Sequence, residues 1–298
     1  MTATAADRAR PVEGGKARSR LLTGALLLPA TLWYVVLLVA PILIVLLFSF
    51  GNRGRTGGYV AAFTLDNYLT AFRTLDPFFT SLRLSVFGTA LCLLVGLPLA
   101  YFIATRATKR KALLIVLLVV PFWTSFLIRT YAWILILGPD GLAGFFQDLT
   151  GNTSFRILGT EPAVLIGLVY GYLPLMIFPL YVTLERMDRS LVEASKDLGA
   201  GRWATFRQVT LPIALPGLIT GSILVFIPMM GEYVIPQLLG YGQVYTVGNL
   251  LYSRFLDNRN WPSGSALGVI LILIMLAVVT VYVWFTNRGR TVRDVSVV

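Results

Sequence analysis

Six long apolar runs alternate with shorter polar segments along the chain. Each run holds roughly the 20 residues that a helix needs to cross about 30 Å of hydrocarbon. We therefore predict an all-α, polytopic membrane protein. Its six transmembrane helices are expected at residues 21–50, 79–105, 112–137, 163–184, 216–239 and 264–286.

The first apolar run follows a basic segment that contains Arg8, Arg10, Lys16, Arg18 and Arg20. A secretory signal also begins with basic residues, but the apolar core of a cleaved signal is about 7–15 residues long. The run from Leu21 to Phe50 is longer, so we predict a retained span. The chain then divides into a basic N-terminal tail at 1–20, a membrane domain at 21–286 and a C-terminal tail at 287–298.

The distribution of charge predicts the orientation. The chain carries 25 Lys and Arg residues against 14 Asp and Glu residues, a formal net charge of +11. Most of the basic residues lie in the two tails and in loops 106–111 and 185–215. Because Lys and Arg are enriched on the cytoplasmic side of a membrane, we predict that both tails and both loops are cytoplasmic. This asymmetry accounts for the positive charge without a nucleic-acid partner.

Composition excludes several classes of function. Hydrophobic residues make up 56% of the chain and charged residues 13%, with a mean hydropathy of +0.76. The chain has no histidine and one cysteine, Cys92, so an internal disulfide and a His/Cys metal site are excluded. The sequence also lacks a phosphate-binding loop and paired carboxylates within a span. We expect no metal, no cofactor and no catalytic site, and ATP hydrolysis would need another subunit.

Segment 185–215 has the pattern of two short amphipathic helices. Ser190 and Glu193 have the spacing of a capping box, which predicts a helix start. Apolar residues then recur at helical spacing, at Leu191, Ala194 and Leu198. Gly199 stands where a left-handed residue would end the first helix. A second amphipathic turn carries Trp203, Phe206 and Val209. We predict that Pro212 ends this turn.

On physical grounds this loop could rest on its own spans or dock a cytoplasmic partner, and a family resemblance favours docking. The residues that carry it are Glu193-Ala194-Ser195, Gly199 and Val209-x-Leu211-Pro212. They resemble the EAA loop of bacterial ATP-binding-cassette (ABC) importer permeases, whose usual pattern is E-A-A, three residues, Gly, nine residues and Ile-x-Leu-Pro. The spacing is kept, with Ser195 in place of the second Ala and Val209 in place of Ile.

The resemblance implies a type I ABC importer permease fold in the bacterial inner membrane, with a core at about 79–286 and a cytoplasmic coupling helix. The implied partners are a cytoplasmic ABC ATPase dimer, a second similar permease subunit and an extracytoplasmic substrate-binding protein. The residues implied to couple to the ATPase are Glu193, Ala194, Asp197, Leu198, Gly199, Trp203 and Phe206. The chain itself would be a transport subunit rather than an enzyme.

Two charged residues fall inside predicted spans, Arg129 in the third and Glu232 in the fifth. At 1.5 Å per residue they lie roughly 26 Å and 24 Å from the cytoplasmic ends of these spans. An intramembrane charge usually has a partner, so a fixed Arg129–Glu232 salt bridge is one interpretation. In the other, Glu232 faces the translocation path and binds a cationic substrate.

Aromatic residues near these charges could add cation–π contacts or form an interfacial belt. They are Trp123, Tyr131, Trp133, Tyr170, Tyr172 and Tyr233. The candidate substrate path therefore consists of Glu232, Tyr233, Trp123, Arg129 and Tyr170. Glycines four residues apart, Gly167 with Gly171 and Gly217 with Gly221, would let another helix approach the fourth and fifth spans closely.

Three further strings narrow the resemblance: PFWTSFLIRTYAW at 121–133, LVFIPMMGEYVIPQLLG at 224–240 and NRNWPSGSA at 258–266. They resemble the polyamine (spermidine/putrescine) branch of the type I permeases. The implied substrate is a small cationic amine, a polyamine such as putrescine or spermidine. Gln237 stands where many members carry a second acid, so another small amine or a zwitterion (opine, betaine-like or amino-acid-like) stays open. A self-sufficient secondary transporter is the rival class, disfavoured by the EAA loop.

Overall fold

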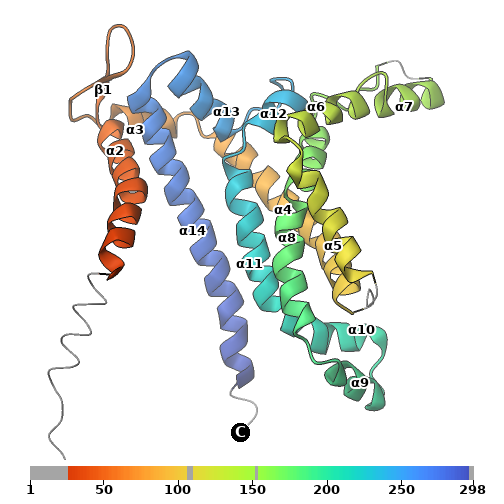
Figure 1. Cartoon of the computed structure of the whole chain (residues 1–298). Helices are drawn as coiled ribbons and strands as arrows, with labels where there is room; N and C mark the ends of the chain where they lie inside the picture. The colour runs from red at the N-terminus through yellow and green to blue at the C-terminus, as the bar shows by residue number, and fades with distance from the viewer. Residues whose placement is uncertain (1–25, 106–109, 152–153, 295–298) are drawn as a thin grey trace, which may run out of the picture.

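Figure 1 shows a computed structural model of the chain, which is almost entirely helical and describes residues 26–105, 110–151 and 154–294. Six described segments are long and apolar enough to cross a membrane, as predicted. They are Leu26–Ser49, Asp76–Thr105, Phe126–Thr150, Glu161–Glu185, Arg202–Met230 and Trp261–Trp284. The predicted basic tail at 1–20 lies outside the described residues. The all-α class is confirmed.

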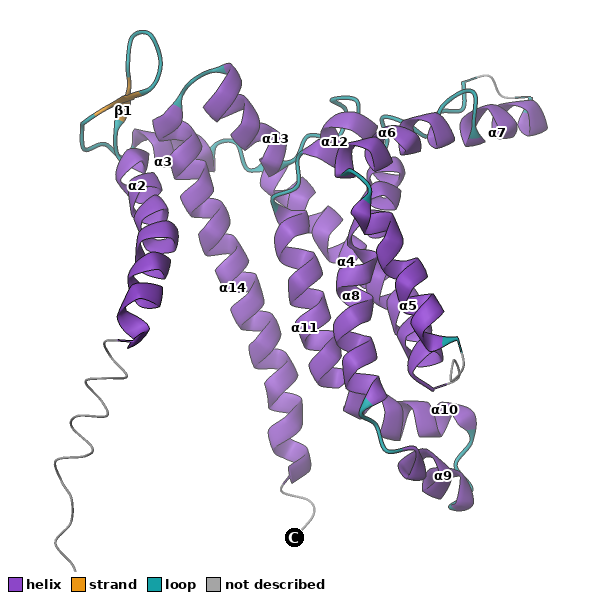
Figure 2. Ribbon diagram, in the orientation of Figure 1, coloured by secondary structure: helices purple, strands orange, loops and turns teal. Residues whose placement is uncertain are grey.

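Short helices and one small hairpin connect these segments (Figure 2). In chain order the elements are η1 (Val35–Val39), α2 (Ala40–Ser49), β1 (Asn52–Arg53), β2 (Tyr59–Val60), α3 (Asp66–Phe72), α4 (Asp76–Thr105), α5 (Lys111–Val119), η2 (Val120–Trp123), α6 (Phe126–Leu137), α7 (Leu142–Thr150), α8 (Glu161–Glu185), α9 (Arg189–Asp197), α10 (Arg202–Thr205), η3 (Phe206–Thr210), α11 (Leu211–Met230), α12 (Val234–Leu239), α13 (Val247–Tyr252), η4 (Ser253–Asp257) and α14 (Trp261–Asp294). Strands β1 and β2 pair antiparallel, with Asn52 opposite Val60.

Three long helices, α4, α8 and α11, pack against one another at the centre of the bundle. The side chains buried among them include Cys92, Met176, Leu180 and Val225. Glycines allow α11 to approach α8 closely. A Cβ atom on Gly217 would lie 2.6 Å from the Pro179 carbonyl oxygen, and one on Gly221 would lie 2.9 Å from the Met176 sulfur. The close helix contact predicted for this glycine pair is confirmed.

Helix α14 packs against α2 and α3 and forms a second group beside the central three helices. A second cluster of buried apolar residues, which includes Phe78, Phe226 and Leu267, joins this group to the ends of α4 and α11. In Figure 1, α9 and α10 lie at the lower end of the molecule, whereas the hairpin, α13, α12, α6 and α7 lie at the upper end. Helix α14 continues to Asp294, so the predicted tail boundary at 287 does not mark the end of a helix.

The third predicted span, 112–137, is wrong as a single helix. Helix α5 passes into the 3-10 turn η2, and the chain is extended at Thr124, with ψ 152°, before α6 begins. Pro121 lies in that turn and has no N–H to donate to the preceding helix. Figure 1 shows α6 and α7 leading away from the top of α5, across the direction of the long helices. Apolar composition continues through the break, so hydropathy did not reveal it.

The fifth predicted span, 216–239, has both boundaries wrong. The helix is continuous from Arg202 through η3 into α11, so Pro212 does not end it. The Leu211 N–H donates to the Phe206 carbonyl, five residues back. This wider π-helical turn carries the chain past the proline, which itself has no N–H. Helix α11 then ends at Met230, and α12 begins after a short break at residues 231–233.

Candidate functional site

Helices α9 and α10 form a bent pair, which we name the elbow (residues 188–206), at the lower end of the bundle (Figure 1). The bend depends on Gly199, whose φ is +82°. Its N–H donates to the Lys196 carbonyl at 2.8 Å. A Cβ on Gly199 would meet no described atom within 4 Å, so glycine is needed for its conformation rather than for space. The predicted left-handed end of the first helix is confirmed.

The predicted capping box of Ser190 and Glu193 is wrong. The N-cap residue is Asp188, whose carboxylate accepts a hydrogen bond from the Ser190 N–H at 3.0 Å. A carboxylate that accepts a backbone hydrogen bond favours its charged form, so this contact lowers the pKa of Asp188. Helix α9 therefore begins before Ser190, and the exposed Glu193 is not held in the cap.

A hydrogen bond between two hydroxyls joins the arms of the elbow. The Oγ atom of Ser195 lies 3.0 Å from Oγ1 of Thr205, which is buried. Ser195 is the residue that departs from the usual alanine of the EAA pattern. The departure therefore adds a polar link between α9 and α10.

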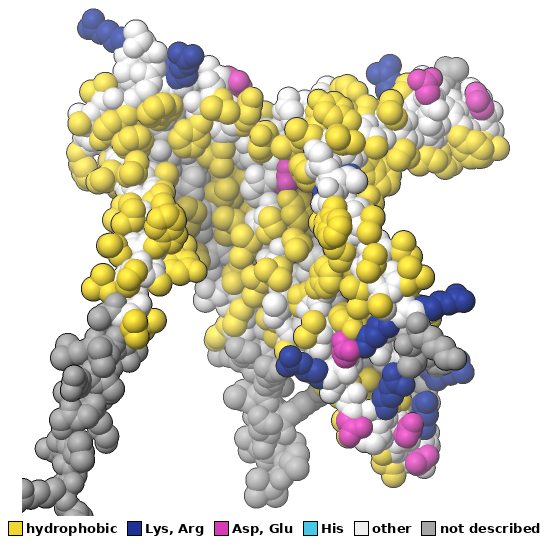
Figure 3. Space-filling view, in the orientation of Figure 1, with side chains coloured by type: hydrophobic (Ala, Val, Ile, Leu, Met, Phe, Trp, Pro, Cys, Tyr) yellow, Lys and Arg dark blue, Asp and Glu magenta, His cyan; other side chains and the backbone are white. Residues whose placement is uncertain are grey.

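The elbow exposes large apolar side chains. Leu198 is 88% exposed and Trp203 is 72% exposed. The Trp203 ring stacks on the half-buried Phe206 with a centroid distance of 5.6 Å. The remaining predicted coupling residues, Glu193, Ala194 and Asp197, are also exposed. Figure 3 shows basic and acidic side chains gathered over the same lower end. Apolar residues surrounded by a polar rim are typical of a protein interaction surface.

Glu232 lies half-buried in the break between α11 and α12. One carboxylate oxygen, Oε2, accepts a hydrogen bond from the Tyr172 hydroxyl of α8 at 2.5 Å. The other, Oε1, accepts from the N–H groups of Val234 at 2.8 Å and Ile235 at 3.4 Å. The carboxylate thus accepts hydrogen bonds from backbone N–H groups in the first turn of α12 and also joins this helix to α8. A carboxylate offers about four acceptor positions, so these three bonds leave room for a ligand.

An aromatic groove lies beside this break. The rings of Tyr233 and Tyr252 stack with a centroid distance of 5.1 Å. They line a cavity of about 360 Å³ together with Gly231, Gly248, Leu251, Phe255 and Leu256. The Asn249 side chain donates to Gln237 Oε1 at 2.9 Å and to the Tyr233 carbonyl at 3.2 Å. Gln237 therefore joins α12 to α13, a role that its position in the sequence did not indicate.

Arg129 does not pair with Glu232, so the interpretation of a fixed salt bridge is wrong for this structure. The guanidinium carbon of Arg129 lies 4.7 Å from the Phe122 ring centroid and 6.0 Å from that of Phe126. Its Nε and Nη1 atoms are buried without a hydrogen-bond partner. The oxygens of Glu232 instead accept from Tyr172 and from the backbone of α12.

The five residues predicted for the path fall into separate places. Glu232 and Tyr233 share the break. Arg129 and Tyr170 line a small crevice between α6, α8 and α12, where Tyr170 contacts Trp133 edge-on at 5.4 Å. Trp123 is 86% exposed at the end of η2. The structure adds Tyr172, Tyr252 and Asn249 to the break, and these contacts arise from helix packing rather than from sequence spacing.

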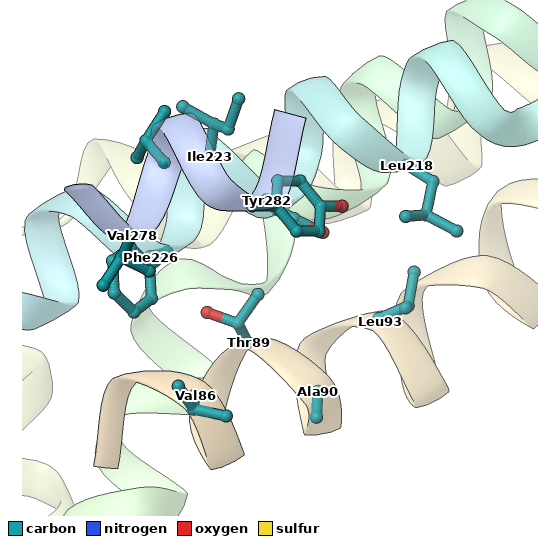
Figure 4. A pocket seen from close by; sticks show the side chains of 11 residues that line it. Val86, Thr89, Ala90, Leu93, Leu218, Ile223, Phe226, Val278 and Tyr282 are labelled. Atoms are coloured by element: carbon teal, nitrogen blue, oxygen red, sulfur yellow. The ribbon is translucent and has the colours of Figure 1, made fainter. Parts of the chain in front are cut away.

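Another cavity, of about 280 Å³, lies between α4, α11 and α14 (Figure 4). None of the described residues that line it is charged, and most are apolar. The hydroxyls of Thr89 and Tyr282 are buried at this place without hydrogen-bond partners. Burial of a cation needs a compensating charge, so this cavity is a poor path for a charged solute.

Comparison with known families decides the class of protein. The model for the binding-protein-dependent transport system inner membrane component matches residues 15–290. The chain belongs to this family. It is therefore a multi-pass inner-membrane permease, a transport component rather than an enzyme.

Individual relatives agree with this assignment. The spermidine/putrescine transport system permease protein PotB of Haemophilus influenzae is 41% identical over 254 residues, covering 84% of this chain and 89% of PotB. PotB of Escherichia coli is 38% identical over 263 residues, covering 86% and 94%. The inner membrane ABC transporter permease protein YdcU of Escherichia coli is 32% identical over 241 residues, covering 76% and 75%.

Solved structures support the fold. A chain of a bacterial ABC transporter involved in the import of alginate superposes with a TM-score of 0.71 at 18% identity, covering 92% of this chain and 98% of that chain. A chain of the MetNI methionine ABC transporter has a TM-score of 0.55 at 18% identity, covering 72% and 94%. The permease has the type I importer fold, as predicted.

Proposed function

We propose that this permease forms the translocation path for a small cationic amine in an ATP-driven importer, with a polyamine such as putrescine or spermidine as the substrate. The half-buried Glu232 carboxylate, in a helix break beside an aromatic groove, carries the proposal. Ionisable groups within membrane segments mark substrate pathways unless a partner neutralises them. The similarity to PotB proteins supports the same substrate class.

At this site Glu232 accepts a hydrogen bond from an ammonium group of the amine. The faces of Tyr233 and Tyr252 attract the cation further. The apolar residues of the groove contact the methylene chain between amine groups. Tyr172 holds the carboxylate in place through its 2.5 Å hydrogen bond.

ATP hydrolysis takes place on a separate cytoplasmic ABC ATPase dimer that docks on the elbow. Leu198 and Trp203 enter a groove of the ATPase, and Glu193 and Asp197 pair with its basic residues. Because the helix runs without a break from Arg202 to Met230, movement of α10 displaces the lower end of the Glu232 site directly. A second similar permease completes the path, and an extracytoplasmic binding protein delivers the amine.

This arrangement requires that the elbow and both termini are cytoplasmic. A membrane-impermeant thiol reagent added to intact spheroplasts should label Thr74→Cys and Gly151→Cys but not Lys196→Cys, which is exposed on the elbow. The background is low because the native Cys92 is fully buried. Labelling of the 196 site from outside would show that the elbow is extracytoplasmic. The predicted orientation would then be wrong, and the elbow could not contact a cytoplasmic ATPase.

Glu232→Gln tests the substrate role. The amide oxygen can still accept from the N–H groups of α12, whereas the negative charge is lost. We expect an assembled complex of unchanged thermal stability whose ATP-driven uptake of labelled putrescine, in proteoliposomes, falls about tenfold or more, as for loss of about 1.4 kcal/mol or more. Tyr172→Phe keeps the carboxylate charge and should reduce uptake less.

A double-mutant cycle with Arg129→Gln provides the control. Because Arg129 and Glu232 do not pair, the two effects on stability should add within about 0.5 kcal/mol. Recovery of assembly and uptake in the double variant, relative to the single variants, would show that the two charges form a structural pair. This result would refute the substrate role of Glu232.

Gln237 favours a second candidate substrate, because an uncharged residue beside the groove suits a singly charged or zwitterionic amine. Competition decides between them. Unlabelled spermidine should block uptake of labelled putrescine, and glycine betaine should not. If glycine betaine blocks the uptake of labelled putrescine and spermidine does not, the substrate is a betaine-like solute rather than a polyamine. Uptake by this chain without an ATPase or ATP would identify a secondary transporter.

A further inference from the structure

Helix α7 extends from the upper end of the molecule, away from the central bundle (Figure 1). Among its residues only Ala143 is buried. The helix is anchored at one side to the loop that follows it. There the Gln147 side chain donates to the Phe155 carbonyl at 2.8 Å, and the Phe146 ring lies 5.6 Å from that of Phe155. Most of the surface of α7 is therefore not covered by other described residues of the chain.

The exposed surface of α7 is divided into an apolar and a polar face. Four large apolar side chains recur at positions i, i+3, i+4 and i+7, which places them on one face of a helix. They are Leu142 (43% exposed), Phe145 (60%), Phe146 (39%) and Leu149 (69%). Gln147 and Asp148 lie on the opposite side. In Figure 3 hydrophobic side chains cover the lower edge of α7, toward the spans, and acidic side chains lie along its upper edge.

The apolar face of α7 continues the membrane-facing surface of the protein. By length and composition, residues 126–150 resemble one membrane span. The chain turns at Gly138, where ψ is −178° and α6 ends, so α7 is a separate helix. Its nine residues extend over roughly 14 Å, which is too short to cross the hydrocarbon. A short amphipathic helix at a membrane boundary lies in the interface, with its apolar face about 5–10 Å deep.

We propose that α7 is an interfacial anchor that binds the lipid leaflet farther from the elbow. Leu142, Phe145, Phe146 and Leu149 insert among the upper acyl chains, and Asp148 stays in water. The exposed acids Asp140 and Asp148 are not attracted to anionic headgroups. Insertion of the apolar side chains therefore provides the free energy of membrane binding. Because α7 follows α6 after the turn at Gly138, the anchor also fixes the C-terminal end of α6. This inference rests on the membrane location of the family and not on the transported solute.

Spin labels on adjacent residues test the anchor in the assembled transporter, reconstituted in phosphatidylcholine vesicles. Leu149→Cys and Asp148→Cys, each in a Cys92→Ala background, place one label on each face. Oxygen concentrates in the acyl region and a nickel chelate stays in water. We expect the label at 149 to collide more with oxygen than with nickel, and the label at 148 to show the reverse.

Two results would overturn the proposal. Equal access of nickel to both labels would place the whole helix in water. Protection of the 149 label from both reagents would show that protein, such as a second permease, covers the apolar face. Phe145→Cys repeats the test on the same face if Leu149→Cys does not assemble. Uptake of any amine is irrelevant to these outcomes, so failure here leaves the proposed function untouched.

Discussion

Trp203→Ala should weaken ATPase docking and leave the permease itself intact. The side chain is 72% exposed and stacks on Phe206. A fully covered Trp buries about 150–250 Å², so about 110–180 Å² of Trp203 is available to a partner. At about 25 cal/mol per Å² this area corresponds to a ceiling of about 3–4.5 kcal/mol. Ordering costs at the interface reduce the gain. We expect a loss of about 2 kcal/mol, a dissociation constant roughly 30-fold higher.

The assay is a titration of labelled ATPase against the permease in nanodiscs. Phe63→Ala is the matched control, because Phe63 is 84% exposed and stacks on Phe50 at 5.2 Å, but lies at the opposite end of the molecule. It should leave the dissociation constant unchanged. The thermal unfolding midpoint should be unchanged in both variants. Wild-type affinity of Trp203→Ala, or an equal loss in Phe63→Ala, would refute the docking role of the exposed tryptophan.

Three further tests address the elbow and the core. Gly199→Val forces a β-branched residue to φ +82° at a cost of about 1–3 kcal/mol and should abolish ATP-driven uptake at normal membrane levels, whereas Gly201→Val, at φ −67° in open space, should not. Gly217→Ala meets the Pro179 oxygen at 2.6 Å and should destabilise the bundle by about 1–3 kcal/mol in thermal unfolding, whereas Gly171→Ala, at 3.7 Å from its neighbour, should be tolerated. The hydrogen bond from the Ser190 N–H lowers the pKa of Asp188. The stabilisation that the Asp188 carboxylate gives to α9 is therefore complete above the ordinary aspartate pKa, and it is lost as pH falls through the lowered value. ATPase affinity should decline on such acidification in the wild type and less in Asp188→Asn.

Properties that depend on short stretches of chain were predictable. Six apolar segments long enough to cross a membrane followed from the length of the apolar runs, since a membrane sets a minimum number of helical residues, although the third segment divides into separate helices. The conformation of Gly199 followed from its place after an amphipathic turn. The sequence also predicts that the elbow is an interaction segment, because its apolar residues have helical spacing in a polar loop. The family match agrees with the resemblance, and the contact with a partner stays a prediction.

Errors arose where two local signals competed. Ser190 and Asp188 are both good capping residues. The sequence does not show at which of them the helix begins, and the structure places the N-cap at Asp188. Pro212 normally ends a helix, but a π-helical turn before it lets the chain continue. The break after Pro121 lies in an apolar run, so hydropathy could not separate α5 from α6.

The sequence by itself determined the class of protein and six apolar segments long enough to cross a membrane, and it predicts the elbow as the segment that meets a partner. Tertiary structure alone decided what surrounds Arg129 and Glu232, the two charges that fall inside predicted spans. Equal depth allowed Arg129 and Glu232 to pair, but the turn into α6 places Arg129 against Phe122, and the helix break leaves N–H groups that Glu232 satisfies. The direction of a side chain depends on where each helix stops and on what packs beside it, and neither is encoded by position along a span.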